Sequence, residues 1–173
     1  MNKVFSSVAG VDAPPPGDPR DPRPQSSHDN VTSAVRYSEA NGVPSGKVML
    51  GIAFHGRGFT EVSSRDAGLY SKYTGGFPET PWSTVESQFL TSPDWVRHWS
   101  ATAEAPWRRN ASRHVFITRD DPLSLGIKAL FVRRQQLYGV MIWVLAEDDP
   151  RNCLLNALVL HLQPRGLPRH ARH

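Results

Sequence analysis

Two polar side chains follow an apolar strand-like run in residues 47–60, KVMLGIAFHGRGFT. Alternation along a strand puts His55 and Arg57 on one face together with Gly51 and Ala53, so small residues accompany the polar ones. An imidazole donates hydrogen bonds and changes charge near neutral pH, and a guanidinium offers five donors in a fixed geometry. The segment therefore predicts one half of a site, and the other half must come from elsewhere.

The paired carboxylates of the chain have structural explanations. Asp120 and Asp121 precede Pro122, and a carboxylate cap followed by proline at the first helical position is a signal for a helix start. Asp148 and Asp149 lie in an acidic turn before the last expected helix. We expect both pairs to shape turns, and we name no catalytic residue.

Disulfide and metal chemistry find little support in the sequence. Cys153 is the single cysteine, which excludes an internal disulfide framework, and we expect it to be a small buried apolar side chain. His161, His170 and His173 lack flanking structure and carboxylate ligands, so we expect chance composition there. No metal and no cofactor is predicted.

Composition narrows the class of protein. The chain has 173 residues, a net charge of +4 and 39% hydrophobic residues, which allows one domain or part of a larger one with a core. The sequence pI is about 9.6, but Lys and Arg are scattered among 16 acids, so we expect no nucleic acid partner. No apolar run approaches the roughly 20 residues of a membrane span, and no export signal follows Met1.

Helices and strands are expected to alternate along the chain. A Pro-rich lead-in precedes the first helix, which Asn30 caps and Asn41-Gly42 ends. Two apolar runs are typical of parallel strands buried on both faces. This order is typical of an α/β protein with right-handed crossovers. The expected segments are a lead-in at 12–30, helices at 31–40, 122–138 and 152–161, and strands at 47–54 and 139–145.

Residues 60–119 do not keep this alternation. They hold four of the five tryptophans, Trp82, Trp95, Trp99 and Trp107, among Gly, Pro and Ser. Such aromatic density predicts a small inserted subdomain with its own core, or an aromatic wall beside a cleft.

Four segments, in order and spacing, resemble the C-terminal part of a glycoside hydrolase family 18 chitinase. KVMLGIAFHGRGFT is similar to the family's seventh strand, K-L-V-L-G-I-P-F-Y-G-R-G-F, and YGVMIWVLAEDD to its eighth, G-G-V-M-I-W-x-L-x-x-D-D. The run WVRHWSATAEAPWRRNASRHVFITRDDPLSL resembles a Trp and an Ala-x-x-Pro-aromatic before F-I-T-Y-D-D-P-x-S. NVTSAVRYSEANGVPSGK resembles the helix and turn before strand seven.

The resemblance implies an α/β fold, a partial TIM (β/α)8 barrel with C-terminal strands and helices only and an inserted small α+β subdomain. The implied organisation is a loose lead-in at 1–29, barrel at 30–59 and 120–162, the chitinase insertion at 60–119, and a disordered basic tail at 163–173.

The family reaction is substrate-assisted hydrolysis, in which the sugar's 2-acetamido oxygen attacks its own anomeric carbon while a protein acid protonates the leaving oxygen. That acid ends a D-x-x-D-x-D-x-E motif on strand four, which does not occur in these 173 residues. Of the second family segment, M-x-Y-D, at best the first residue is matched, by Met1. The resemblance therefore implies a substrate-binding surface without its acid.

Three residues match the implied binding surface. Trp143 matches the tryptophan on which the reacting sugar stacks, and otherwise reads as a core tryptophan. Arg57 matches a groove arginine that can hold sugar hydroxyls or acetamido groups, and otherwise reads as part of an ion pair. His55 replaces a tyrosine whose hydroxyl reaches the acetamido group, and Arg119 replaces an aromatic residue; both are departures from the family.

Three functions remain open: the last part of a chitin hydrolase, a non-catalytic chitin-binding protein, and a non-functional fragment. The implied partner is chitin or a chitooligosaccharide, and the missing N-terminal barrel strands are an expected requirement, because two parallel strands alone expose an apolar face and open edges. The family is secreted, although localisation cannot be assigned from this sequence.

Overall fold

The computed structural model describes residues 8–163. The four α-helices over this range are α1 (Val31–Ala40), α2 (Trp82–Val85), α3 (Pro122–Arg134) and α4 (Cys153–Leu162). The strands are β1 (Met49–Ala53), β2 (His55–Thr60), β3 (Gly75–Pro81), β4 (Trp95–Ser100), β5 (Ala105–Asn110), β6 (Val115–Arg119) and β7 (Gly139–Trp143). Short helical turns lie at Ser45–Lys47, Arg65–Gly68, Glu86–Leu90 and Leu145–Glu147.

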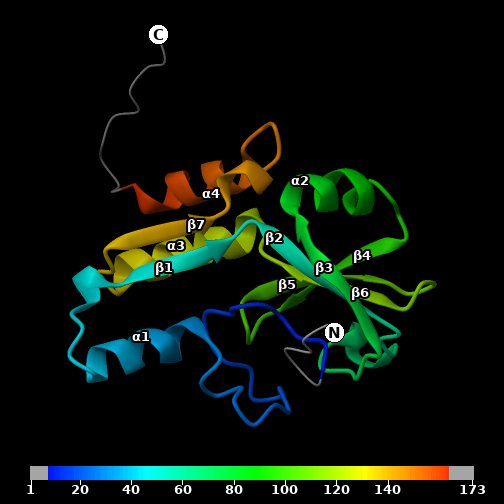
Figure 1. Ribbon diagram of the computed structural model, residues 1–173, viewed down its shortest axis with the longest axis horizontal. Helices are drawn as coiled ribbons and strands as arrows, with labels where there is room; N and C mark the ends of the chain where they lie inside the picture. The colour runs from blue at the N-terminus through cyan, green and yellow to red at the C-terminus, as the bar shows by residue number, and fades with distance from the viewer. Residues whose placement is uncertain (1–7, 164–173) are drawn as a thin grey trace.

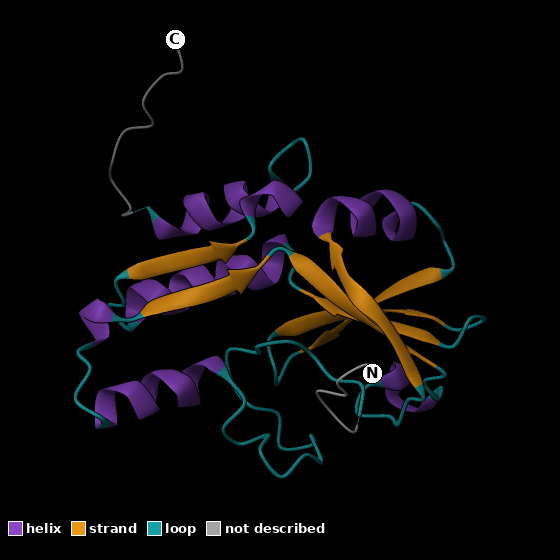
Figure 2. Ribbon diagram, viewed as in Figure 1, coloured by secondary structure: helices purple, strands orange, loops and turns teal. Residues whose placement is uncertain are grey.

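The strands form two separate sheets, at opposite ends of the molecule (Figure 1). β1 and β7 pair in parallel, with Met49 opposite Gly139 and Ala53 opposite Trp143. The other five strands form an antiparallel sheet in the order β3-β2-β6-β5-β4. Figure 2 shows the helices gathered around the two-stranded sheet, with α2 beside the five-stranded one. The predicted α/β fold with a partial parallel barrel is confirmed.

Helices α3 and α4 cover one face of the parallel sheet. Ile52 and Phe54 are buried against Leu125 of α3 and Leu154 and Leu158 of α4, in one apolar cluster. Because side chains alternate along a strand, Leu50 and Ile52 point to the helices while their neighbours point away. The crossover from β1 to β7 therefore returns through α3, as parallel pairing requires.

The other face of the parallel sheet is open. Met49 of β1 is 49% exposed, and Met141 and Trp143 of β7 are 46% and 64% exposed. The prediction that both strands are buried on both faces is therefore wrong for this chain. An apolar run indicates that a strand belongs in an interior but does not identify what buries it, and over residues 8–163 only helices on one side do so.

Helix starts agree with the sequence prediction more closely than helix ends. Asn30 accepts from the Ser33 amide at 2.9 Å and begins α1, and the predicted stop at Asn41-Gly42 is confirmed, with Gly42 at φ +83°. Helix α3 ends at Arg134, not at the expected Tyr138. The chain reverses there because Gln136 takes a left-handed conformation with φ +52°.

The lead-in lacks helix and strand over residues 8–30, as predicted, but it is anchored. Ala9 and Val11 are buried in the core under the five-stranded sheet, beside Trp107 and Phe116. Its backbone also bonds the insert, since the Tyr70 amide donates to the Ala9 carbonyl at 2.7 Å. A segment rich in Pro and Asp forms no helix or strand, but it can still pack against the core. The tail at 164–173 lies outside the described residues.

The predicted division of the chain into barrel and insertion stays a prediction, but the structure adds one relevant fact. Strand β2, which starts at His55, pairs with β3 and β6 of the five-stranded sheet. The chain therefore passes from one sheet to the other at Phe54, whose amide donates to the Trp143 carbonyl at 3.0 Å. None of the helices between residues 8 and 163 has the length and apolarity to cross a membrane.

A buried ion pair joins Asp120, just before α3, to Lys128 within α3. The Lys128 Nζ lies 2.6 Å from Asp120 Oδ2, and both side chains are almost fully buried. The Ser124 hydroxyl also donates to Asp120 Oδ1 at 2.8 Å. Burial raises the pKa of Asp120, and Lys128 opposes that rise. The neighbouring Asp121 accepts from the Leu123 and Ser124 amides and caps α3, as expected.

Replacing Lys128 by methionine leaves the Asp120 carboxylate buried without its counter-charge. We expect K128M to lower the free energy of unfolding by about 3 kcal/mol at pH 8 in urea titrations. The loss should shrink as the pH falls, because a carboxyl with a raised folded-state pKa becomes neutral first in the folded protein. The exposed Lys47→Met serves as control, and an equal effect of the two substitutions at pH 8 contradicts the prediction.

Candidate functional site

The candidate site forms where the two sheets meet. β7 ends at Trp143, paired with Ala53 at the end of β1, and β2 begins two residues later at His55. Both parallel strands deliver their carboxyl ends to this junction. In a (β/α)8 barrel the functional groups lie at the carboxyl ends of the strands, so the position fits a site.

His55 is buried and lies between two carboxylates. Its Nδ1 is 3.2 Å from Glu147 Oε2, in the turn that follows β7, and its Nε2 is 3.6 Å from Glu79 Oε1 on β3. The contact with Glu147 is within hydrogen-bond distance, and the longer one to Glu79 is an electrostatic contact. His55 therefore connects the turn after the parallel sheet with the antiparallel sheet.

Arg57 shares one of these carboxylates. Its Nη2 donates to Glu79 Oε1 at 3.3 Å, and its Nη1 lies 4.0 Å from Asp12 Oδ1 of the lead-in. Glu79 is 53% exposed and Arg57 37% exposed at the side chain, so both remain accessible to a ligand. Asp12 is held by its own amide, which donates to the Thr118 hydroxyl at 2.8 Å.

A hollow of about 1270 Å³ opens beside this group. Asp12, Arg57 and Glu79 line it from the insert and lead-in, and Met49 and Gly51 line it from β1. Carboxylates and a guanidinium above an apolar strand face suit a ligand with both hydroxyl groups and apolar C–H surface.

The structure brings together two of the three predicted site residues directly. His55 and Arg57 both contact Glu79. Trp143 lies on the open face of the other sheet and connects to His55 through backbone, since its carbonyl accepts from the Phe54 amide, and through Glu147, whose Oε2 also accepts from the Val144 amide at 3.4 Å. Because its indole is exposed, Trp143 is not a core residue of the part described, residues 8–163. Its role in binding stays a prediction.

Sequence reasoning missed Asp12, Glu79 and Glu147. Asp12 was part of a Pro-rich loop and Glu147 of an acidic turn, while Glu79 lay in the irregular insert. The contact between His55 and Glu147 spans 92 positions. Period-two alternation identifies the face on which a side chain lies but not its partner across such a separation.

Arg119 lies on the other face of the five-stranded sheet and is not part of the site. Gly56 pairs with Arg119 and Arg57 with Thr118, so Arg57 and Arg119 point to opposite sides. The Arg119 guanidinium stacks 4.3 Å from the centre of the buried Trp82 ring. Burial, with Arg108 nearby, lowers the pKa of Arg119 to about 9.

The insert tryptophans are mainly core residues. Trp82, Trp95 and Trp107 are buried, and Trp99 is partly exposed beneath the Arg97 guanidinium. The Trp107 indole donates to the Ala67 carbonyl at 3.1 Å. Only Trp99 among these four therefore stays open as an aromatic surface.

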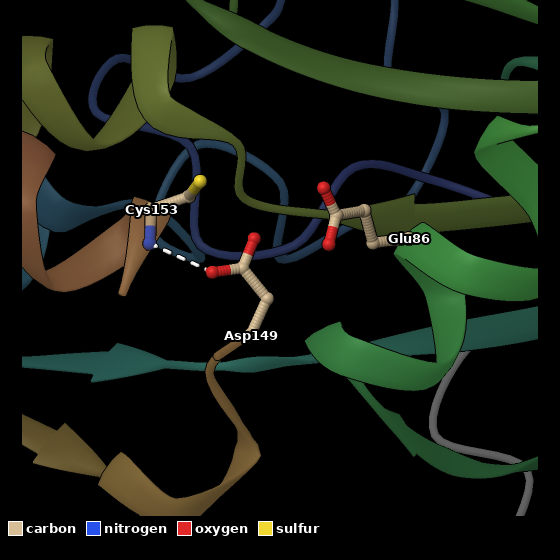
Figure 3. A group of neighbouring side chains, drawn as sticks. All are labelled: Glu86, Asp149 and Cys153. Carbon is tan, nitrogen blue, oxygen red and sulfur yellow. Dashed lines mark hydrogen bonds between the residues drawn. The ribbon is translucent and has the colours of Figure 1, made fainter. Parts of the chain in front are cut away.

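Glu86, Asp149 and Cys153 point toward one another at the start of α4 (Figure 3). Asp149 caps the helix, since its Oδ1 accepts from the Cys153 amide at 3.0 Å. The Arg151 guanidinium pairs with Glu86 and lies 3.5 Å from Asp149. The arrangement is explained by a helix cap and an ion pair, and a metal ion would compete with Arg151.

The structure also shows where Cys153 and His161 lie. Cys153 is partly exposed beside carboxylates, so the expectation of a buried apolar side chain is wrong. His161 donates from Nδ1 to the Ala157 carbonyl at 2.8 Å on α4, while His170 and His173 lie outside the described residues.

Comparison with known proteins gives consistent matches. The family described as Glycosyl hydrolases family 18 matches residues 3–148. "Chitinase A1" of Niallia circulans is 29% identical over 176 aligned positions, which cover 96% of this chain and 25% of that protein. This chain thus spans about a quarter of that relative's length.

Solved structures extend the likeness to the fold. A family 18 N-acetylglucosaminidase from Paenibacillus barengoltzii superposes with a TM-score of 0.82 at 28% identity, covering 91% of this chain and 45% of that one. Human YKL-39, described as a pseudo-chitinase with retained chitooligosaccharide binding properties, superposes with a TM-score of 0.78 at 26% identity, covering 90% of this chain and 45% of that one.

The contact between Asp149 and Cys153 predicts a slow thiol. The neighbouring carboxylate raises the pKa of Cys153, and burial adds to the rise. Because the thiolate is the nucleophile, iodoacetamide should alkylate the folded chain at pH 8 more slowly than the urea-unfolded chain, by about tenfold for each pKa unit. Asp149→Asn should speed the folded reaction and the exposed Asp66→Asn should not; equal folded and unfolded rates contradict the prediction.

Proposed function

Because the chain belongs to glycosyl hydrolases family 18, we propose that it is the C-terminal part of a chitinase-type protein whose parent activity is hydrolysis of β-1,4-linked N-acetylglucosamine. The observation that carries this proposal is Trp143, an indole that is 64% exposed at the carboxyl end of a parallel strand. The hydrophobic effect favours burial of a tryptophan side chain. An exposed tryptophan at the carboxyl end of a parallel strand is therefore expected to contact a ligand or a covering partner.

Trp143 is the sugar platform in this proposal. The flat apolar face of an indole fits the C–H face of a pyranose, and its N–H remains available to a polar group. Ala53 pairs with Trp143 on β1, and Gly51 lies two residues earlier on the same strand face. These small neighbours leave room above the sheet for a ring.

Arg57 and Glu79 supply hydrogen bonds to the sugar. A guanidinium donates to hydroxyl or acetamido oxygens, and a carboxylate accepts from hydroxyl groups. Their mutual contact at 3.3 Å holds both side chains at the hollow before a ligand arrives. Ordering them in advance lowers the entropic cost of binding.

The described residues offer binding groups but no obvious acid for the leaving oxygen. Glu147 lies against His55 and the Val144 amide, and Glu79 lies between His55 and Arg57. The acid of the family reaction ends a D-x-x-D-x-D-x-E motif, which does not occur in these 173 residues. The parent activity therefore requires the acid of strand four, from the barrel strands that precede this part of the family fold.

A second candidate is a non-catalytic chitin-binding protein. It is favoured by the exposed Trp143 together with His55, which stands where the resembled family has a tyrosine. Human YKL-39, which combines pseudo-chitinase character with chitooligosaccharide binding, provides a precedent among the structural relatives. The third candidate, a non-functional fragment, requires that neither hydrolysis nor binding is measurable.

Hydrolysis distinguishes the catalytic candidate. We expect residues 1–173 alone to release no fluorophore from a fluorogenic chitobioside above the rate of a buffer blank, because the acid is missing. Co-expression with the preceding barrel strands of a family member tests the requirement for them and should restore turnover. Turnover by the chain alone that is abolished in W143A contradicts this prediction.

Retention on chitin beads distinguishes binding from no function. We expect the chain to be retained and W143A to lose at least most of this retention, since stacking on one aromatic ring contributes on the order of 1–3 kcal/mol. Tyr138→Ala is the matched control, because Tyr138 is 73% exposed just before the opposite end of β7. Equal retention of W143A and Y138A would remove Trp143 from the site.

A further inference from the structure

His55 has contacts that the binding proposal does not use. The imidazole is buried, with 6% of its side chain exposed, and each ring nitrogen faces a carboxylate. A buried side chain reaches a soluble sugar poorly, so direct contact with the ligand does not explain its position. Its two partners come from different parts of the fold: Glu79 is on β3 of the five-stranded sheet, and Glu147 is in the turn after β7.

Glu147 in turn holds the residue that follows Trp143. Its Oε2 accepts from the Val144 amide at 3.4 Å, and its own amide donates to the Val144 carbonyl at 3.0 Å. The turn is therefore closed around Val144 by backbone and side chain together. The same oxygen, Oε2, faces His55 Nδ1 at 3.2 Å, which places the imidazole at the end of a short chain of contacts leading to Trp143.

We propose that His55 is a positioning residue that fixes the Trp143 platform relative to the groove wall formed by Arg57 and Glu79. The proposal rests on the proposed function of Trp143 as a sugar platform. His55 faces Glu147 on one side and Glu79 on the other, so it links the turn that follows the indole at the end of β7 to strand β3, which carries Glu79. Substrate geometry at such a site depends on small displacements.

Charged groups hold the link from several sides. The groups around the imidazole are Glu147 from the turn after β7, Glu79 from β3, and Arg57 from β2, which also pairs with Glu79. Arg57 therefore holds Glu79 from a second side, so a displacement of this carboxylate disturbs two contacts at once.

Fluorine NMR of the whole chain labelled with 5-fluorotryptophan tests this without a ligand. The Trp143 signal is assigned by its loss in W143F, and the buried Trp82, Trp95 and Trp107 report that the fold is intact. We expect His55→Phe to displace the Trp143 signal from its wild-type position, because Glu147 and Glu79 then no longer face an imidazole nitrogen. The signals of the three buried tryptophans should stay near their wild-type positions.

Conservative variants separate positioning from a merely structural role. His55→Gln keeps a donor toward Glu147, so it should return the Trp143 signal to near its wild-type position. Glu147→Ala removes the carboxylate that faces His55 and the Val144 amide, so it should displace the signal, and it remains informative if His55→Phe fails to fold. A Trp143 signal at its wild-type position in folded His55→Phe or in Glu147→Ala overturns the proposal.

Adding N,N′,N″-triacetylchitotriose separates this inference from the function on which it rests. If the proposed function holds, the sugar moves the Trp143 signal, and His55→Phe binds it about tenfold more weakly because the platform is no longer fixed. Wild-type affinity in His55→Phe overturns the positioning role. If no tryptophan signal moves at saturating sugar, the binding function fails, and the Trp143 signal of the variants without sugar still decides whether His55 positions Trp143.

Discussion

Parallel pairing of β1 with β7 is the constraint on which the rest of the structure depends. Two parallel neighbours cannot be joined by a hairpin, so the chain must leave β1, cross over, and return on the same side. Here the crossover holds both the five-stranded sheet and α3. The same pairing brings Trp143 and Ala53 to one edge, next to the residue where the second sheet begins. The site is therefore a consequence of how the crossover starts.

The five-stranded sheet separates two groups of charged side chains by alternation alone. Arg57 and Arg119 lie on neighbouring strands at adjacent register positions but on opposite faces. Arg57 faces the lead-in and the hollow, where carboxylates neutralise it. Arg119 faces the buried Trp82, where desolvation disfavours its charge. One strand-to-strand step thus separates a cation that lines the hollow from an interior one, and the departure from the family at Arg119 does not reach the hollow.

Local signals in the sequence predicted what is local in the structure. The caps at Asn30 and Asp121 and the final helix follow from side chains that bond amides within a few positions. The end of α3 was missed because the left-handed residue there is Gln136, and not the glycine or proline that usually indicates a helix end in a sequence. The burial of the parallel strands was overstated because apolar patterning identifies an interior strand without its neighbours. Family resemblance supplied Trp143 and Arg57, whereas the partners of His55, 24 and 92 positions away, were beyond any local pattern.

The insertion within the crossover also shapes the order in which this chain folds. β4, β5 and β6 are consecutive antiparallel neighbours joined by short turns, so they can pair early at little entropic cost. The β1–β7 contact instead closes a loop of many tens of residues. Each doubling of such a loop adds only about 0.6 kcal/mol to the free energy of loop closure. Contacts between residues close in sequence nevertheless form faster. Once the antiparallel sheet exists, the ends of β2 and β6 are held side by side. We expect the folded insert to shorten the effective loop between the parallel strands. Pairing of β1 with β7 is then the late step of folding.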